Sequence, residues 1–128
     1  MGNALGYPQA VWALFRDTPR AGRFAPGTPG VLVSEAGTPA GRGRIRLECR
    51  IDKNLIADSH FQAWGCPYTI ASAAWAAGWL VGRTAQAAAA FRAADVTQAL
   101  EIPDDRTHCS LMAEDAVRGL FTRTMAAR

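Results

Sequence analysis

The sequence predicts one α+β domain over residues 1–128, with helices packed on one face of a small antiparallel three-stranded sheet. Two segments, 44–51 and 55–64, alternate apolar and polar residues with the period of a β-strand. After Gly65 the pattern becomes helical and stays helical. Strands followed by helices are typical of a sheet that is covered on one side, and 128 residues suffice to bury such a core.

The first third of the chain is expected to supply one helix and one strand. Residues 7–16 carry apolar side chains at helical spacing, and Pro8 fits the first turn of that helix. Residues 18–43 are rich in glycine and proline, which indicates a loop. The run Val31–Val33 interrupts this loop and predicts a short edge strand.

The two alternating segments predict a hairpin with its turn at 52–54. The first strand is expected to turn inward Ile45, Leu47, Cys49 and Ile51. The second strand is expected to turn inward Leu55, Ala57, Ser59, Phe61 and Ala63. Cys49 is therefore interpreted as a packed core thiol, and His60, on the polar face, as solvated.

Four helices are expected after Gly65. The first runs over 67–81 and stops at Gly82, and its Trp75 and Trp79 form a core stripe. Thr84 caps a second helix that reaches about residue 93. Asp95 caps a short third helix, and Asp104 or Asp105 starts the last. The apolar stripe of the last helix is expected to hold Leu111, Ala116 or Val117, Leu120 and Met125.

The composition excludes few classes of function but sets useful limits. A net charge of +3, carried by 13 arginines and one lysine, does not require nucleic acid and suits an acidic protein partner equally well. The chain has no apolar run of the roughly 20 residues that span a membrane, and no signal-peptide pattern, so a cytoplasmic location is expected. Arg42, Arg44, Arg46 and Arg50 share a strand face, interpreted as solvated rather than as a docking surface.

The chemistry of the chain is concentrated at two expected helix starts. Cys66 lies between a strand and a helix, where the helix dipole favours a thiolate. His108 and Cys109 lie at the start of the last helix. Thiolates with an imidazole suit zinc or an iron–sulfur cluster, although two buried cysteines and a satisfied histidine fit these residue types equally well. A thiol enzyme is the weakest alternative, because no oxyanion hole is marked and no enzyme activity is expected.

These residues lie in two segments that resemble iron–sulfur cluster assembly scaffolds of the IscU and NifU N-terminal type. Residues 65–73 (GCPYTIASA) resemble the family's G-C-x-x-x-I-A-S-S segment, and residues 107–116 (THCSLMAEDA) resemble its H-C-S-x-L-A-E-x-A segment. The resemblance implies that Cys66, His108 and Cys109 bind zinc, iron or a [2Fe–2S] cluster. It further implies that Cys109 accepts persulfide sulfur from a cysteine desulfurase, and that the cluster passes to iron–sulfur acceptor proteins. Arg106 stands where the family has a lysine.

The chain departs from the family where the first ligand segment, P-x-C-G-D, would lie. An ungapped match places Gly41 at the cysteine and Gly43 at the aspartate, and a match with one inserted residue places Ala40 and Arg42 there. Either match removes both side-chain ligands. Residues 102–106 (IPDDR) keep one proline of the family's chaperone-binding loop, so chaperone recognition is expected to be impaired.

The prediction is therefore an open site with three ligands. Its fourth position would be filled by Asp105, water, an exogenous thiol, a partner's side chain or a second copy of the chain, and by Cys49 only if its strand rolled over. Two functions follow. The chain is a scaffold that holds a metal ion or a labile cluster, or it is a cluster-free homologue that docks on or regulates the desulfurase machinery.

Overall fold

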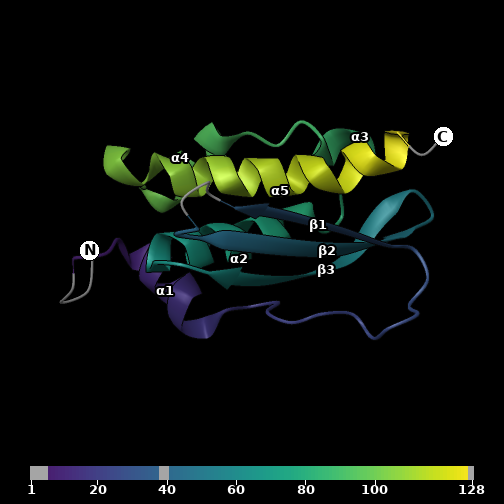
Figure 1. The fold of residues 1–128 in the computed structure, drawn as a ribbon, viewed down its shortest axis with the longest axis horizontal. Coiled ribbons are helices and arrows are strands. Elements are labelled where there is room, and N and C mark those ends of the chain that lie inside the picture. Colours follow the sequence, from purple (N-terminus) through teal and green to yellow (C-terminus); the bar gives the residue numbers. More distant parts are fainter. Residues whose placement is uncertain (1–5, 38–40, 127–128) are drawn as a thin grey trace.

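The structure is a computed structural model that describes residues 6–37 and 41–126. Along the chain the elements are α1 (Gln9–Asp17), β1 (Val31–Gly37), β2 (Arg44–Asp52), β3 (Leu55–Trp64), α2 (Pro67–Leu80), α3 (Ala85–Ala88), α4 (Ala93–Leu100), the 3₁₀ helix η1 (Asp104–Arg106) and α5 (Thr107–Ala126) (Figure 1). None of the helices in this described part is both long and apolar enough to cross a membrane.

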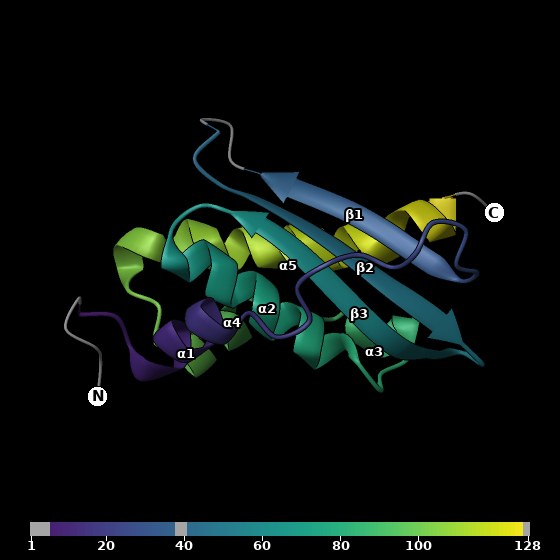
Figure 2. The ribbon, with the colours of Figure 1, turned by 90° about the horizontal axis from the view of Figure 1, so that it is seen from below.

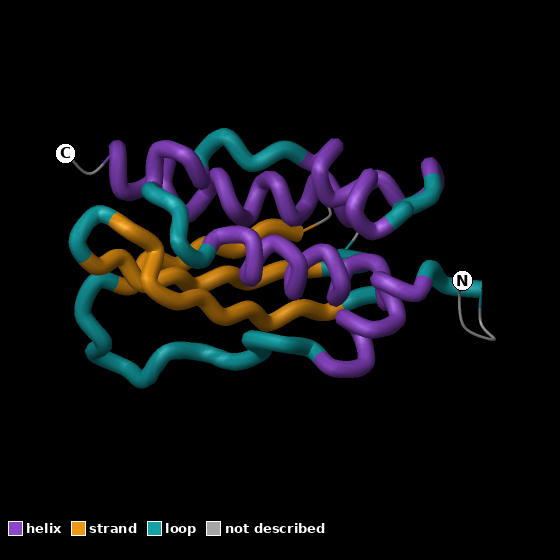
Figure 3. Tube along the Cα trace, turned by 180° about the vertical axis from the view of Figure 1, so that it is seen from behind, coloured by secondary structure: helices purple, strands orange, loops and turns teal. Residues whose placement is uncertain are grey.

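The predicted fold class is confirmed. The strands form one antiparallel sheet in the order β1-β2-β3. Helix α2 packs on β3 and β2, and helix α5 packs on the same face against β1 and β2. The Ser34 hydroxyl of β1 donates a hydrogen bond to the Ala116 carbonyl of α5. Figure 3 shows α5, the longest helix, on one side of the strands and the loop before β1 on the other.

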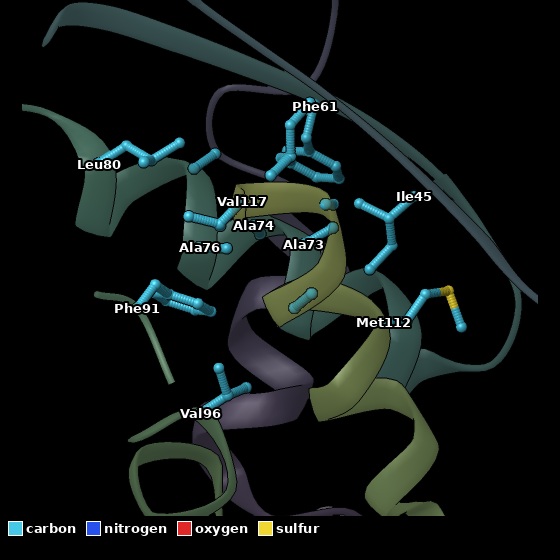
Figure 4. Close-up of a cluster of buried hydrophobic side chains, with 14 of the residues drawn as sticks. Ile45, Phe61, Ala73, Ala74, Ala76, Leu80, Phe91, Val96, Met112 and Val117 are labelled. Carbon is cyan, nitrogen blue, oxygen red and sulfur yellow. The ribbon is translucent and has the colours of Figure 1, made fainter. Parts of the chain in front are cut away.

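The core lies between the sheet and these two helices. From β2 it takes Ile45, Leu47 and Cys49, all fully buried, as the alternation predicted. Helix α2 is rich in alanine and buried on most of its surface, which lets the sheet, α5 and α1 approach it closely. Figure 4 shows side chains from the sheet (Ile45, Phe61), from α2 and from α5 (Met112, Val117) meeting in one cluster.

The hairpin contains a bulge that the alternation did not reveal. Arg50 pairs with Asp58, but Ile51 pairs with Ile56, so Ala57 is an extra residue on β3. The extra residue reverses the faces of the strand at this point. Ile56 is buried, and the inward positions predicted for Leu55 and Ala57 are wrong because both are exposed. Beyond the bulge the prediction holds, and Ser59 and Phe61 are buried.

Two expected helices differ from the prediction. Thr84 caps α3 as predicted, with its Oγ1 accepting from the Ala87 amide at 3.1 Å, but this helix ends at Ala88. The chain turns there so that Phe91 can insert, fully buried, beside Trp75 and Trp79. Helix α4 then begins after Arg92 rather than at an Asp95 cap.

Smaller corrections concern the first strand and the last helix. Strand β1 extends to Gly37 and is longer than the predicted Val31–Val33. On α5, Leu111 is 49% exposed while Met112 is buried, so the predicted apolar stripe is wrong at that position. Gly119 of α5 lies against β1, because a Cβ there would be 3.2 Å from the Ser34 Cβ.

The outer face of the sheet is partly covered by residues 18–30. Residues 20–22 run along the free edge of β3, where the Phe61 amide donates to the Arg20 carbonyl at 3.0 Å and the Gly22 amide donates to the Phe61 carbonyl at 2.9 Å. Figure 2 shows the segment continuing across β3 and β2 towards β1. The Phe24 ring packs on His60 with centroids 4.5 Å apart. His60 is therefore half-buried, and the prediction that it is solvated is wrong.

The arginine face is also less solvated than predicted. Arg46 bridges Glu35 at 3.1 Å and Glu48 at 2.9 Å, and only 18% of its side chain is exposed. Glu48 is buried, and its Oε1 accepts from the Phe24 amide at 2.9 Å. Arg44 is exposed and pairs with Glu35 at 2.9 Å. The outer face of β2 is thus a network of ion pairs beneath the 18–30 segment.

Candidate functional site

Cys66 occupies the N-cap position of α2, as the sequence predicted. Strand β3 ends at Trp64, Gly65 turns the chain at a φ of +143°, and Pro67 starts the helix. Proline suits this first position because its missing amide would have no partner there. The half-buried Cys66 thiol therefore lies at the positive end of the dipole of a 14-residue helix.

Cys109 reaches the same point from the start of α5. The 3₁₀ turn η1 leads into this helix, and the Thr107 hydroxyl donates to the Asp104 carbonyl at 2.8 Å. Cys109 lies in the first turn of α5 and is fully buried. Its Sγ lies 4.0 Å from the Sγ of Cys66, although 43 residues separate the two in sequence.

Thr69 joins the two thiols, and sequence reasoning missed it. Its Oγ1 lies 3.2 Å from the Cys109 Sγ and 3.8 Å from the Cys66 Sγ, and the residue is almost fully buried. Gly65 makes room for it, because a Cβ at Gly65 would lie 2.9 Å from the Thr69 Oγ1. The sequence did contain one signal for Thr69: it lies three residues after the N-cap residue Cys66, at a position whose side chain faces the capping group.

The two thiols differ in reactivity. Burial opposes ionisation of Cys66, but the nearby amides of Thr69 and Tyr68, the Thr69 hydroxyl and the Cys109 thiol stabilise the thiolate and lower its pKa overall. Burial raises the pKa of Cys109 to about 11, and a negative charge on Cys66 acts in the same direction. Cys66 is the accessible thiol that ionises more easily, and Cys109 is the buried one that stays protonated.

The structure does not bring His108 to the thiol pair. His108 is exposed on the first turn of α5, and its side chain points about 100° away from that of its neighbour Cys109 around the helix. Asp105 is exposed in η1. Within the described ranges, no three His, Cys, Asp or Glu side chains are grouped so as to hold a metal ion.

Cys49 stays in the core, as predicted. It is fully buried on β2 opposite Leu32 and Ser59, and burial raises its pKa to about 12. A thiol in this position neither ionises readily nor faces the other two. The cysteines that the structure brings together are Cys66 and Cys109.

The segment expected to lack the first ligands borders the thiol pair. Gly43 is buried, and a Cβ there would lie 3.4 Å from the Thr69 Oγ1 and 3.0 Å from the Met112 Cε. Ala40 lies outside the described residues. The open side is a pocket of about 320 Å³, lined by Gly41, Arg42, Gly43, Arg44, Trp64 and Gly65.

The thiol pair fits one metal ion. Two thiolates that bind zinc at about 2.3 Å in tetrahedral geometry lie about 3.8 Å apart. The observed separation of 4.0 Å is close to this value. The pair could therefore supply two of the four ligands of such a site without a change of fold.

Comparisons with known proteins agree with this architecture. Residues 6–122 match the NifU-like N terminal domain. The iron–sulfur cluster assembly scaffold protein IscU of Escherichia coli (strain K12) is 29% identical over 115 residues, which cover 89% of this chain and 90% of that protein. Iron–sulfur cluster assembly protein 2 of Arabidopsis thaliana is 30% identical over 113 residues, covering 88% of this chain and 69% of that protein.

A solved structure supports the fold. The N-terminal part of a nitrogen-fixing NifU-like protein from Brucella abortus superimposes with a TM-score of 0.70 at 16% identity, covering 94% of each chain. Its strands and helices therefore follow the same path as β1–β3 and the helices packed on them. Because the family match extends over residues 6–122, the chain belongs to the NifU-like N-terminal domain family of iron–sulfur cluster assembly scaffolds.

Proposed function

We propose that the protein is an assembly scaffold whose cargo is a zinc or iron ion, or a labile [2Fe–2S] cluster, held by Cys66, Cys109 and His108. The observation that supports this most directly is the pair of sulfurs 4.0 Å apart at two helix starts. His108 is the proposed third ligand, because it directly precedes Cys109 and its ring is exposed. Its imidazole must move towards the thiols to join them.

The proposed site is open and labile. Zinc and [2Fe–2S] sites normally take four ligands, so two thiolates and an imidazole leave one position for an outside group. Gly41 and Gly43 offer no donor atom at the remaining corner, and Arg42 adds positive charge there. Cargo is consequently held less tightly than in a complete cage, which suits a protein that passes its cargo to iron–sulfur acceptor proteins.

Cys109 is the proposed sulfur acceptor, with a cysteine desulfurase as the donor partner. Its thiolate attacks the outer sulfur of the donor's persulfide, and the donor cysteine leaves as a thiolate. Because Cys109 is buried beneath Thr69 and its pKa is raised to about 11, this step requires the site to open so that the thiol can lose its proton to solvent, and the half-buried Cys66 is the thiol that a donor meets first. The protein carries sulfur and metal without turning over a substrate, and we place it in the cytoplasm, where thiols stay reduced.

Chaperone recognition is proposed to be weak. Pro103 is the exposed proline before η1, and the two residues that follow it are acidic. These acidic residues stand where the family's chaperone-binding loop continues with a second proline. If the chain bound the family's usual chaperone as tightly as a relative with the full loop does, this part of the proposal would be contradicted.

A second function is supported by the missing ligand corner. A cluster-free homologue that docks on the desulfurase, or regulates it, would not need donor atoms at Gly41 and Gly43. The exposed His108, turned away from the thiols, is compatible with that role. The two functions differ in whether purified protein holds metal and sulfide in fixed ratio to the chain.

Metal and acid-labile sulfide analysis after anaerobic reconstitution tests the proposal. We expect stoichiometric metal in the parent protein and its loss in Cys66→Ala, Cys109→Ala and His108→Ala. Cys49→Ala is the matched control, since it removes a buried thiol away from the site and should keep the metal. A folded, metal-free parent that still binds the desulfurase would exclude the first function and support the second.

A further inference from the structure

The pocket beside the thiol pair has the size of a small-molecule site. Its volume of about 320 Å³ lies at the lower end of the range of ligand pockets, roughly 300–1,000 Å³. It is formed where the segment before β2 approaches the end of β3. Its lining residue Gly41 has no side chain, and no atom lies within 4 Å of the position that a Cβ there would take. A molecule of two or three amino acids matches this volume.

The pocket is lined by residues that border the thiol pair. Gly65 lines it and directly precedes Cys66, the accessible thiol of the pair. Gly43 also lines it, and a Cβ there would lie 3.4 Å from the Thr69 Oγ1, which is itself 3.2 Å from the Cys109 Sγ. A ligand seated in the pocket therefore contacts the residue before Cys66 and the residue that borders Thr69.

The lining favours an anionic ligand. Two arginines, Arg42 and Arg44, belong to the lining, and no acidic residue does. Arg44 pairs with Glu35 at 2.9 Å, and the Arg44 side chain is 63% exposed. An exposed ion pair of this kind is weak, so a ligand carboxylate can replace Glu35 at Arg44 with little loss of binding. Trp64, 55% exposed, offers a flat surface for the body of the ligand.

The chemistry of the pair defines the donor atom. Cys66 and Cys109 are soft thiolate ligands, and metals that choose them are bound best by further sulfur donors. Water would leave the metal with a weaker ligand. We propose that this pocket is a binding site for a small anionic thiol, of the size and charge of glutathione, which presents its sulfur beside Cys66 and Cys109. The proposal rests on the proposed function for its role, in which the bound thiolate completes the coordination of the cargo metal.

Binding is tested first without metal, so that the pocket is judged apart from the scaffold function. Glutathione and S-methylglutathione are titrated into reduced, metal-free protein while the amide signals of Gly41, Gly43 and Gly65 and the Trp64 indole signal are followed by nuclear magnetic resonance. We expect both peptides to shift these signals, and 2-mercaptoethanol, which lacks carboxylates, to leave them unchanged. Arg44→Ala should weaken binding about fivefold, the equivalent of one exposed ion pair, and the distant Arg16→Ala should not. Absence of these shifts, or equal shifts with 2-mercaptoethanol, would overturn the proposal.

Cobalt(II) then tests the role of the sulfur, because thiolate-to-cobalt charge-transfer absorption increases with each thiolate bound. Glutathione should strengthen this absorption, and S-methylglutathione should not. Gly41→Cys supplies the thiolate from within the chain and should make the spectrum independent of glutathione. Gly27→Cys is the matched control, because Gly27 also has a positive φ and open space at its Cβ position, far along the chain from the pocket; it should keep the glutathione response.

The outcomes separate the two levels of the proposal. Shifts in metal-free protein without any cobalt binding would support the pocket and contradict the scaffold function. Cobalt binding with no glutathione response, combined with a strong response to a cysteine of the desulfurase, would overturn the small thiol in favour of a partner's side chain.

Discussion

Gly65→Ala is expected to destabilise the fold and displace the thiol pair. Gly65 has a φ of +143°, in a region that residues with a side chain occupy at a cost of about 1–3 kcal/mol. The added methyl group would lie 2.9 Å from the Oγ1 and 3.0 Å from the Cβ of Thr69. A Cβ cannot be moved by a change of rotamer, so the helix start must shift, which costs about another 1–3 kcal/mol. The expected loss of unfolding free energy is therefore at least about 2 kcal/mol.

Urea denaturation followed by circular dichroism measures this loss, provided that the slope with denaturant is unchanged. Gly27→Ala is the control, because Gly27 has a φ of +84° and no atom within 4 Å of its Cβ position. It carries the backbone cost without the contact. If Gly65→Ala and Gly27→Ala lost the same free energy, the contact with Thr69 would contribute nothing and the reasoning would be refuted.

Three further predictions concern the core and the thiols. Phe91→Ala empties a fully buried site and should cost about 3–5 kcal/mol in urea denaturation, whereas Leu55→Ala, on an exposed side chain, should cost little; similar losses would contradict the packing described. Iodoacetamide should alkylate Cys66 first as the pH is raised, because its pKa is lowered while that of Cys109 is raised to about 11, and peptide mass spectrometry would expose the reverse order. Burial raises the pKa of Cys49 from 9.0 to about 12, so this thiol ionises at lower pH in the unfolded chain than in the folded one. The free energy of unfolding is therefore unaffected below about pH 9. Between pH 9 and 12 it falls by up to about 1.4 kcal/mol per pH unit. Cys49→Ala should flatten this part of the pH profile in thermal melts, and an unchanged profile would exclude Cys49 as its source.

The sheet and its order could be predicted because the signal is local. The alternation over β2 reports which side chains face the core, and the turn at Lys53 and Asn54 joins neighbouring strands with both residues at positive φ. The bulge at Ala57 could not be predicted, since the inserted residue is apolar and continues the apparent pattern. Its effect appears only when the strand is paired.

The helical half shows the opposite limit. The alanine-rich stretch after Thr84 favours a long helix by intrinsic propensity. The chain nevertheless leaves the helix after Ala88, because burying Phe91 against Trp75 and Trp79 is worth more than the few tenths of a kcal/mol that each extra helical residue would add. Phe91 and the two tryptophans lie on separate parts of the chain, so the local sequence pattern does not predict this contact.

For the site, the sequence predicted the residues better than their arrangement. Cys66 and Cys109 were both expected at helix starts, and both lie there. The distance between their sulfurs depends on how α2 and α5 cross the sheet, and no sequence motif predicts this geometry. Thr69 was overlooked because its position three residues after the N-cap relates it to Cys66 but not to Cys109, which lies 40 residues further along the chain. The orientation of His108 likewise depends on where α5 begins.

The packing of α5 on β1 has a consequence for synthesis on the ribosome. The strands β1, β2 and β3 are neighbours in sequence and can pair as soon as they emerge, but the Ser34–Ala116 hydrogen bond joins residues 82 positions apart. Helix α2 follows β3 directly, but at about 5–20 residues per second a nascent chain keeps the inner face of β1, which α5 covers, exposed for several seconds after β3 has been made. During that time Cys66 has no second thiol beside it, since Cys109 has not yet been translated. The thiol pair of the proposed site is therefore complete only when the helix that completes the core has left the ribosome.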